Sequence, residues 1–497
     1  MTFFSGTSVN LLRIKSPRPL LRVLGQIQPR HPRCFNENPH STNVTVRAFS
    51  TTDSALSWWA PKVPADENID PEPSFSDGDA NLTKPDILHT NYVPRRIHIL
   101  GIGNVGTFVA HALAGIPNRP PITLLLHRQV SLHQWNQSNQ SLELVTRGLS
   151  EFRSGFEVEL NEWRDTEDRS PENIAQNDIW EYKDSNSDAD TIGLSELNLN
   201  DKQEPIYNLI VAVSTPFTVR ALRPYKDRLG PQSTILFLQN GMGVQDEVNK
   251  ELFPDIKTRP KYMLGIITHG LAGRRRYSVI QHGFGTMAVG LVPNYPLQYL
   301  HKPELDAESI LKKRLPSWTP VSSRYLLRTL TRTPSLVAAG FAPTDLVQQQ
   351  LEKLAVNCII NPLTTLFDCT NGELLYDYSI TRVMRLLLAE ISLVVRSLPE
   401  LQGLPNVNIR FSPERLETVV VSVAANTAQN HSSMLQAVRR GKQTEVNYIN
   451  GYIVRRGEEL GIKCVMNYMI QHMVHGKSRQ QSKRIASDMP IEGYNDP

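Results

Sequence analysis

The chain has 497 residues, 40% of them hydrophobic, which is enough for two or three domains that each bury a core. No stretch approaches the roughly 18 to 20 consecutive apolar residues of a membrane-spanning helix, so we expect no membrane span. The formal net charge is +4, and the first fifty residues account for this excess, because they carry seven Lys or Arg against one acid. The rest of the chain has no basic stripe interleaved with aromatic residues, which disfavours nucleic acid as a partner.

The N-terminal residues 1–49 are rich in Arg, Ser and Thr and lack a secretory hydrophobic region. Residues 11–24 place Leu and Val on one helical face and Arg on the other, and Arg47-Ala-Phe-Ser resembles a matrix-protease cleavage site. We therefore expect a mitochondrial presequence, cleavage near Phe49 and a location in the mitochondrial matrix; the alternative is a disordered basic tail. Residues 50–93 are rich in Pro, Asp, Ser and Asn, which predicts a linker.

A βαβ unit is predicted next along the chain. Arg96–Leu100 and Ile122–Leu126 are typical of strands, and Thr107–Ala114 between them is typical of a helix. Further strands and one helix are expected at Leu209–Val213, Pro216–Leu229 (the helix), Thr234–Leu238 and Met263–Ile267. This alternation predicts a mainly parallel sheet covered by helices, and hence an α/β, Rossmann-type dinucleotide-binding domain over 94–334.

The second half of the chain has a different pattern. A polar, acidic stretch at about 162–203 predicts a surface insertion in the first domain, and after about Ser335 long helical periodicities begin. Helices are expected over Leu346–Phe367, Ile380–Leu398, Pro413–Asn426 and Thr444–Leu460. We therefore predict an all-helical C-terminal domain over 335–476 and a C-terminal tail over 477–497.

A glycine-rich turn, Gly101-Ile-Gly103-Asn104-Val105-Gly106, joins the first strand to the first helix. In this position the first glycine permits a tight turn, the second lets the backbone approach a pyrophosphate, and the third lets the helix pack close to the strand. The helix N-terminus then offers its free N–H groups to the phosphate. The turn therefore predicts a dinucleotide site.

Two further residues are candidates for the same site. Arg128 follows the second strand, where an acid would bind the ribose of NAD but an arginine accommodates the 2′-phosphate of NADP, so we expect NADPH as cofactor. The alternative is an ordinary surface arginine. Asn240 and Gly241 follow a later strand at the carboxyl edge of the sheet, where Asn240 is a candidate contact for cofactor or substrate, although a simple turn also explains the pair. The four cysteines lack C-x-x-C spacing, so no metal site is expected.

Lys353, Asn357 and Asn361 are spaced four residues apart, which places them along one stripe of a helix whose other face is apolar. A polar stripe of this kind is also typical of a solvent-exposed face. Pro362 is expected to bring the stripe to a helix end or a kink, where a cleft is plausible.

The segment Lys353–Glu373, with Asn430–Gln436 and Thr444–Gly451, resembles the 2-dehydropantoate 2-reductase (ketopantoate reductase) family. The resemblance runs from about residue 96 to 475 and includes the glycine turn, Arg128 and Asn240.

This resemblance implies that Lys353 is the general acid of a hydride transfer and that Glu445 supports catalysis beside it. It also implies substrate-binding roles for Asn357, Asn361, Asn371 and Ser433. The chemistry agrees, because a ketone oxygen that gains negative charge needs a nearby cation able to donate a proton. Glu445 would hold Lys353 or accept a substrate hydroxyl; alternatively it is an acid in the first turn of a helix. Asn371 has a turn residue as its alternative.

One position departs from the family pattern. After the strand Leu209–Val213 the family often has a lysine that contacts cofactor or substrate, whereas this chain has Ser214. The leading hypothesis is a eukaryotic mitochondrial-type enzyme that reduces 2-dehydropantoate to (R)-pantoate with NADPH, a step toward pantothenate and coenzyme A. The alternatives are reduction of another 2-oxo acid, or a non-catalytic NADPH-binding regulatory protein. A homodimer is left open.

Overall fold

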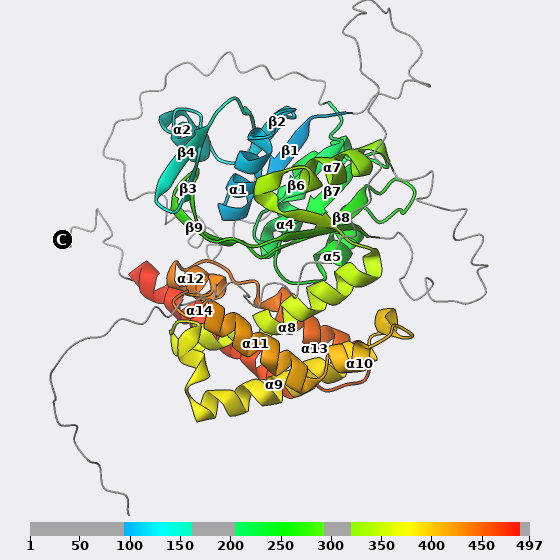
Figure 1. Ribbon diagram of the computed structural model, residues 1–497, viewed down its shortest axis with the longest axis vertical. Coiled ribbons are helices and arrows are strands. Elements are labelled where there is room, and N and C mark those ends of the chain that lie inside the picture. The colour runs from blue at the N-terminus through cyan, green and yellow to red at the C-terminus, as the bar shows by residue number, and fades with distance from the viewer. Residues whose placement is uncertain (1–93, 162–203, 293–319, 488–497) are drawn as a thin grey trace, which may run out of the picture. The chain divides into compact units, whose positions relative to one another are not determined.

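The computed structural model describes residues 94–161, 204–292 and 320–487, all of which belong to one compact unit (Figure 1). The expected presequence over 1–49, the linker over 50–93 and the insertion at 162–203 lie outside the described residues and stay predictions. None of the described helices is both long and apolar enough to cross a membrane.

The first domain is built on an eight-stranded sheet. Its strands are β1 (Ile97–Leu100), β2 (Ile122–Leu126), β5 (Glu157–Leu160), β6 (Asn208–Val211), β7 (Thr234–Phe237), β8 (Lys261–Ile267), β11 (Met287–Leu291) and β12 (Ala338–Gly340). Their order is β12-β11-β8-β7-β6-β1-β2-β5, and the six strands from β8 to β5 run parallel, while β11 is antiparallel to β8. The predicted mainly parallel sheet is confirmed. Because β12 pairs with β11, the sheet extends past the expected boundary at residue 334.

Helices cover both faces of this sheet. Alternate strand residues belong to two separate apolar clusters, one with α1 (Asn104–Ala114) and α7 (Val321–Thr331), and the other with α4 (Thr218–Leu222) and α5 (Val244–Glu251). Strands buried on both faces are mostly apolar and do not alternate, as in Ile122–Leu126, where Thr123 is the one polar residue. The helix expected over Pro216–Leu229 is instead divided into the 3₁₀ turn η2 (Thr215–Phe217), α4 and the 3₁₀ helix η3 (Arg223–Arg228). Pro216 and Pro224 lack the N–H groups that a continuous helix needs.

A second, four-stranded sheet was not predicted. It has the order β4-β3-β10-β9, and its strands are β3 (Leu142–Thr146), β4 (Leu149–Arg153), β9 (Gly270–Arg275) and β10 (Ser278–Gly283). The helix α2 (Gln129–Gln137) connects β2 to β3. Buried residues of β3 and β10 join the same apolar cluster as α1, so that helix packs against both sheets (Figure 1).

The chain direction across the large sheet reverses next to β1. From β1 the chain first adds β2 on one side, and later adds β6, β7 and β8 on the other. In open α/β sheets such a switch point leaves a crevice at the carboxyl ends of the two central strands, where ligands bind. Here the switch point lies between the glycine turn after β1 and the loop after β6.

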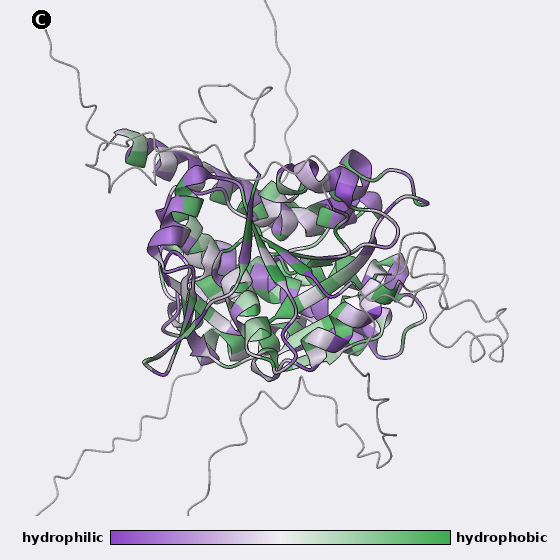
Figure 2. Ribbon diagram, turned by 90° about the horizontal axis from the view of Figure 1, so that it is seen from above, coloured by the Kyte–Doolittle hydropathy of each residue, from purple (hydrophilic) through white to green (hydrophobic). Residues whose placement is uncertain are grey.

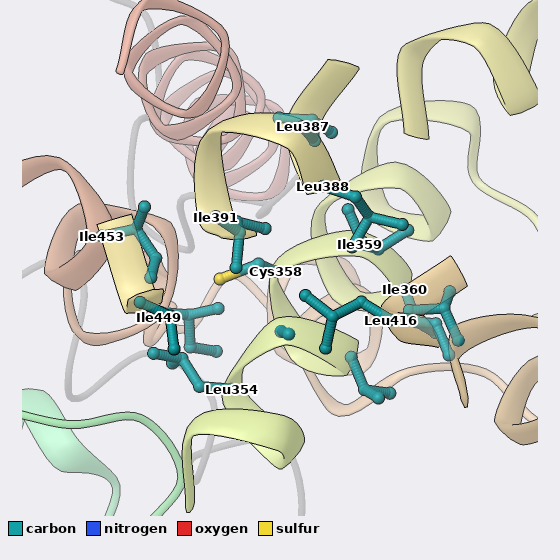
Figure 3. Packing of buried hydrophobic residues seen from close by; sticks show 14 of the residues in the cluster. Leu354, Cys358, Ile359, Ile360, Leu387, Leu388, Ile391, Leu416, Ile449 and Ile453 are labelled. Carbon is teal, nitrogen blue, oxygen red and sulfur yellow. The ribbon is translucent and has the colours of Figure 1, made fainter. Parts of the chain in front are cut away.

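The second domain is helical. It contains α8 (Pro343–Phe367), η6 (Gly372–Leu375), α9 (Tyr378–Ser397), η7 (Pro399–Leu401), α10 (Val407–Arg410), α11 (Pro413–Asn426), α12 (Ser433–Arg439), η8 (Val446–Tyr448), α13 (Asn450–Glu459) and α14 (Val465–Ser487). The 3₁₀ turn η5 (Pro334–Leu336) precedes it. Its core forms around α8, whose Leu354, Cys358 and Ile359 pack against α9, α11 and α13 (Figure 3). Hydrophobic residues gather on the inward faces of these helices and in the strands (Figure 2).

Three predictions for this domain need correction. The helix α8 continues through Pro362 to Phe367, so the helix end expected as one possibility at this proline is not there. The helix expected over Thr444–Leu460 begins only at Asn450, after the separate turn η8. Helix α14 reaches Ser487, so most of the residues expected to form a tail are helical.

Candidate active site

The glycine turn after β1 has the geometry that a dinucleotide requires. Gly101 has φ +96°, and a Cβ there would lie 2.5 Å from the main-chain nitrogen of Val213. A Cβ on Gly106 would lie 2.0 Å from the carbonyl oxygen of Gly101, so only glycine lets α1 approach the strand this closely. A Cβ on Gly103, in contrast, would meet no atom within 4 Å. The second glycine therefore faces open space, where a pyrophosphate could approach the backbone and the N-terminus of α1.

Asn104 and Val105, the other expected cofactor residues of this turn, begin α1. The side-chain oxygen of Asn104 lies against Gly273 of β9, where a Cβ would be 2.7 Å away. The edge strand of the second sheet therefore passes beside the N-terminus of α1.

Arg128 lies where the sequence predicts, directly after β2. It is the N-cap residue of α2 and is partly buried, and its carbonyl accepts hydrogen bonds from the N–H groups of Ser131 and Leu132. The N-cap position fixes its backbone at the carboxyl edge of the sheet, on the side of β2. The residues of this edge thus fit a dinucleotide.

Lys353 lies on α8 and is only partly exposed. Its Nζ donates a hydrogen bond of 3.0 Å to the carbonyl oxygen of Ile267, the last residue of β8. Burial lowers the pKa of this lysine to about 8, while the negative charge of Glu445 acts in the opposite direction. At this pKa the amine can both donate and recover a proton near neutral pH, as a general acid must.

Glu445 is held by two loops of the sheet domain rather than lying in a long helix. Its Oε1 accepts from the N–H of Thr215 at 3.3 Å and lies 3.2 Å from the Thr215 hydroxyl, and its Oε2 accepts from Nδ2 of Asn240 at 3.3 Å. Burial raises the pKa of the carboxyl, whereas these bonds and the charge of Lys353 lower it. The alternative, an acid in the first turn of the helix expected over Thr444–Leu460, is wrong, because α13 begins only at Asn450 and Glu445 is the N-cap residue of the three-residue 3₁₀ helix η8.

The loop after β7 is docked on the helical domain at the same place. Gly241 has φ +82°, and a Cβ there would lie 2.6 Å from the carbonyl oxygen of Tyr448. That carbonyl accepts a hydrogen bond of 2.9 Å from the N–H of Met242, and the Tyr448 hydroxyl donates to Glu247 at 2.7 Å. The Asn240–Gly241 pair therefore forms a turn and also brings Asn240 to Glu445.

A narrow cavity lies between α8 and the ends of the strands β7 and β8. It is lined by Gln239, Asn240, Gly241, Gly265, Ile266, Gln350, Lys353, Leu354 and Asn357. Two of the predicted stripe residues, Lys353 and Asn357, thus face one cavity with Asn240. Gln350, one turn before Lys353 on α8, was not singled out from the sequence, although its spacing places it on the same stripe.

Three expected substrate residues are not among those lining this cavity. Asn361 is buried farther along α8, and its carbonyl accepts from Thr365. Asn371 is buried and donates to the Thr427 hydroxyl at 2.9 Å, while its side-chain oxygen is buried without a hydrogen-bond partner among the described residues. Ser433 is exposed at the start of α12, which its neighbour Ser432 caps.

Thr215 was not predicted as a site residue from the sequence, where only its neighbour Ser214 stood out. Thr215 is 1% exposed, and it bonds both to Glu445 and to the carbonyl of Asn240. The available signal was its place in the loop after a central strand, at the predicted carboxyl edge of the sheet.

Two family models match the chain. The model described as Ketopantoate reductase PanE/ApbA matches residues 97–294, and the one described as Ketopantoate reductase PanE/ApbA C terminal matches residues 345–478.

Known proteins similar to this chain are named as reductases of two different substrates. The probable 2-dehydropantoate 2-reductase of Schizosaccharomyces pombe is 27% identical over 376 residues, which cover 75% of this chain and 93% of that protein. The ketoisovalerate reductase BEA2 of Gibberella fujikuroi is 26% identical over 394 residues, which cover 72% of this chain and 78% of that protein.

The fold also has solved counterparts. The structure of a probable 2-dehydropantoate 2-reductase from Bacillus subtilis aligns with a TM-score of 0.50 and 21% identity, covering 77% of this chain and 99% of that one. At this identity the likeness concerns the fold: a Rossmann-type sheet domain followed by a helical domain.

Proposed function

Since the chain belongs to the ketopantoate reductase family and is an oxidoreductase, we propose that it reduces 2-dehydropantoate to (R)-pantoate with NADPH. The observation that carries this proposal is the position of Lys353. Its ammonium lies at the carboxyl edge of the sheet with Asn240 and Asn357 in one cavity, and its pKa of about 8 suits proton donation.

The cofactor assignment rests on the residues of the glycine turn and on Arg128. The open space before Gly103 and the free N–H groups of α1 fit a pyrophosphate, and Arg128 after β2 suits a 2′-phosphate. When bound, the reduced nicotinamide supplies a hydride to the ketone carbon. The protein residues have to place that carbon and supply the proton.

In the proposed mechanism, Lys353 donates its proton to the ketone oxygen as negative charge develops there. The ammonium stabilises this charge before the transfer, and afterwards the buried neutral amine is tolerated because burial disfavours the charged form. Glu445 keeps the amine protonated at the start, since its negative charge raises the pKa of Lys353. Asn357 offers amide donors one turn along α8 for the substrate's polar groups.

A second candidate substrate is another 2-oxo acid, such as 2-ketoisovalerate. It is favoured by the curated ketoisovalerate reductases among the relatives and by the neutral Ser214 in the loop after β6. The two substrates differ by a hydroxymethyl group, so they test whether a polar group of the site recognises that hydroxyl.

The proposal is tested with the purified full-length chain. Consumption of NADPH is followed with 2-dehydropantoate, 2-ketoisovalerate and a panel of other 2-oxo acids, and the assay is repeated with NADH. We expect the highest kcat/KM for 2-dehydropantoate with NADPH. A higher value for 2-ketoisovalerate would change the substrate assignment, a preference for NADH would change the cofactor, and no turnover with any pair would contradict the enzymatic role.

A further inference from the structure

Thr215 links the two domains at Glu445. It lies in the loop after β6, at the start of η2, is 1% exposed, and lies 230 residues before Glu445 in the chain. Its hydroxyl lies 2.9 Å from the carbonyl oxygen of Asn240 and 3.2 Å from Oε1 of Glu445, and its N–H lies 3.3 Å from the same Oε1. Loops after two adjacent parallel strands, β6 and β7, therefore converge on one carboxylate from the helical domain.

The donors around this carboxylate are neutral. Thr215 supplies a hydroxyl and a main-chain N–H, and Asn240 supplies an amide; Lys353 is the charged group that acts on Glu445. Because Glu445 is partly buried, the ionised form depends on such donors for its stability. Thr215 offers two donors to Oε1, its N–H and its hydroxyl, and a side-chain substitution removes only the hydroxyl.

We propose that Thr215 is a positioning residue, whose hydroxyl holds the Glu445 carboxylate ionised and oriented toward Lys353 during turnover. This inference rests on the proposed function for its catalytic consequence, but the state of Glu445 can be measured without turnover.

The hydroxyl can serve both protonation states of Glu445. It has one proton and two neighbouring acceptors, the Asn240 carbonyl and Oε1. Beside an ionised Glu445 it donates to Oε1 or shares its proton between the two acceptors. Beside a protonated Glu445 it donates to Asn240 and accepts from the acid. The hydrogen bond to the ionised carboxylate is charge-assisted and the stronger of the two, so loss of the hydroxyl disfavours the ionised form more than the protonated one.

The test compares Thr215→Val, which removes the hydroxyl but keeps the shape, with Thr215→Ser, which restores it. Thr215→Ala is a second hydroxyl-free variant in case the valine variant does not fold. Thr333→Val is the matched control, because Thr333 is also 1% exposed and its hydroxyl donates at 2.7 Å to the carbonyl of Thr329, away from Glu445.

The direct readout is the pKa of the Glu445 carboxyl, measured by ¹³C NMR of glutamate-labelled full-length protein, with Glu445→Gln used to assign the signal. Losing one donor to the ionised form is expected to raise this pKa by roughly 0.5 to 1 pH unit in Thr215→Val, with recovery in Thr215→Ser and no change in Thr333→Val. In the reductase assay, the acidic limb of kcat/KM is expected to move to higher pH by the same amount.

An unchanged Glu445 pKa in both hydroxyl-free variants overturns the inference, as does an equal shift in Thr333→Val. If the wild-type chain reduces no 2-oxo acid, the proposed function fails, but the NMR titration still decides the role of Thr215 toward Glu445. If the pKa moves while the pH profile of an active enzyme does not, Thr215 supports Glu445 without positioning it for turnover, and the catalytic part of the inference is wrong.

Discussion

Replacement of Lys353 by methionine removes the ammonium but keeps an unbranched side chain of similar length. We expect kcat for reduction to fall by about a hundredfold or more, which is about 2.7 kcal/mol of activation free energy, because the ketone oxygen loses both its proton donor and the cation that stabilises it. The matched control is Lys477→Met. Lys477 also donates at 3.0 Å to a main-chain carbonyl, that of Leu366, but it lies on α14 and does not line the cavity. The assay is NADPH consumption at saturating substrate. Activity of Lys353→Met within a few-fold of wild type would refute the assignment of the general acid.

The same lysine gives a pH dependence whose sign follows from its burial. The pKa falls from 10.5 to about 8, so Lys353 is protonated and competent as an acid below about pH 8, and the reduction rate should decline above it. The lowered pKa also means that the charged ammonium destabilises the folded state. Each unit of pKa corresponds to about 1.4 kcal/mol, so this cost is about 3 kcal/mol at neutral pH.

We therefore expect Lys353→Met to be more stable than wild type at pH 7, by up to about 3 kcal/mol. The unfolded chain keeps its proton up to the ordinary pKa, so the free energy of unfolding of wild type should rise between pH 8 and 10.5, and the advantage of the variant should shrink. Urea denaturation at several pH values measures the free energy of unfolding of wild type and of Lys353→Met. A constant difference across this range would contradict the burial of the ammonium.

The remaining predictions concern the residues proposed to bind the cofactor. Arg128→Glu is expected to shift the ratio of kcat/KM for NADPH and NADH toward NADH, because an acid repels a 2′-phosphate and binds the ribose hydroxyls; an unchanged ratio would remove Arg128 from the phosphate site. Gly106→Ala is expected to destabilise the fold by roughly 1 to 3 kcal/mol, since the new Cβ would lie 2.0 Å from the carbonyl of Gly101. Gly103→Ala meets no atom within 4 Å, so it should weaken NADPH binding while leaving thermal stability nearly unchanged, and a large loss of stability would show that the space before Gly103 is not open.

The elements that the sequence predicted correctly have strong local signals. Helix α11 has the expected bounds, Pro413–Asn426, with Ser412 as its N-cap and a proline at its first position. The parallel strands β1, β2, β6 and β7 are fully buried and each has only one polar residue, so their type and place could be predicted from the sequence. The second sheet lacks such a signal. Its strand β4 is mostly exposed, and β3 contains Glu143, whose burial depends on Ser150 and Ser278 from other strands.

The helix expected over Thr444–Leu460 shows how a tertiary contact overrides a local pattern. The carbonyl of Tyr448 accepts from the N–H of Met242, in the loop after β7, and the backbone at Ile449 has φ −106° and ψ −96°, which is not helical. A residue in this conformation cannot continue the helix, so α13 starts at Asn450. The residues before Asn450 instead contact loops of the sheet domain, and Glu445 therefore lies beside Thr215 and Asn240.

Some residues of the candidate site could be predicted from their spacing in the sequence, whereas others are brought together only by the fold. Lys353 and Asn357 share a helical stripe, so their common orientation followed from spacing, and the resemblance to the family supplied their roles. The partners of Glu445 could not be deduced from spacing, because Asn240 and Thr215 lie 205 and 230 residues away from it. Only the rule that parallel strands end at one edge brings these loops together.

This arrangement separates two tasks. The proposed proton donor, Lys353, lies on α8, in a helix fixed by the core of its own domain, whereas the groups that bond to Glu445 lie on loops of the sheet domain. Substitutions in the loop after β6, such as the neutral Ser214, can therefore alter the surroundings of Glu445 and the choice of 2-oxo acid while Lys353 keeps its position. We accordingly expect substrate preference to respond more to the β6 loop, and the chemical step more to α8.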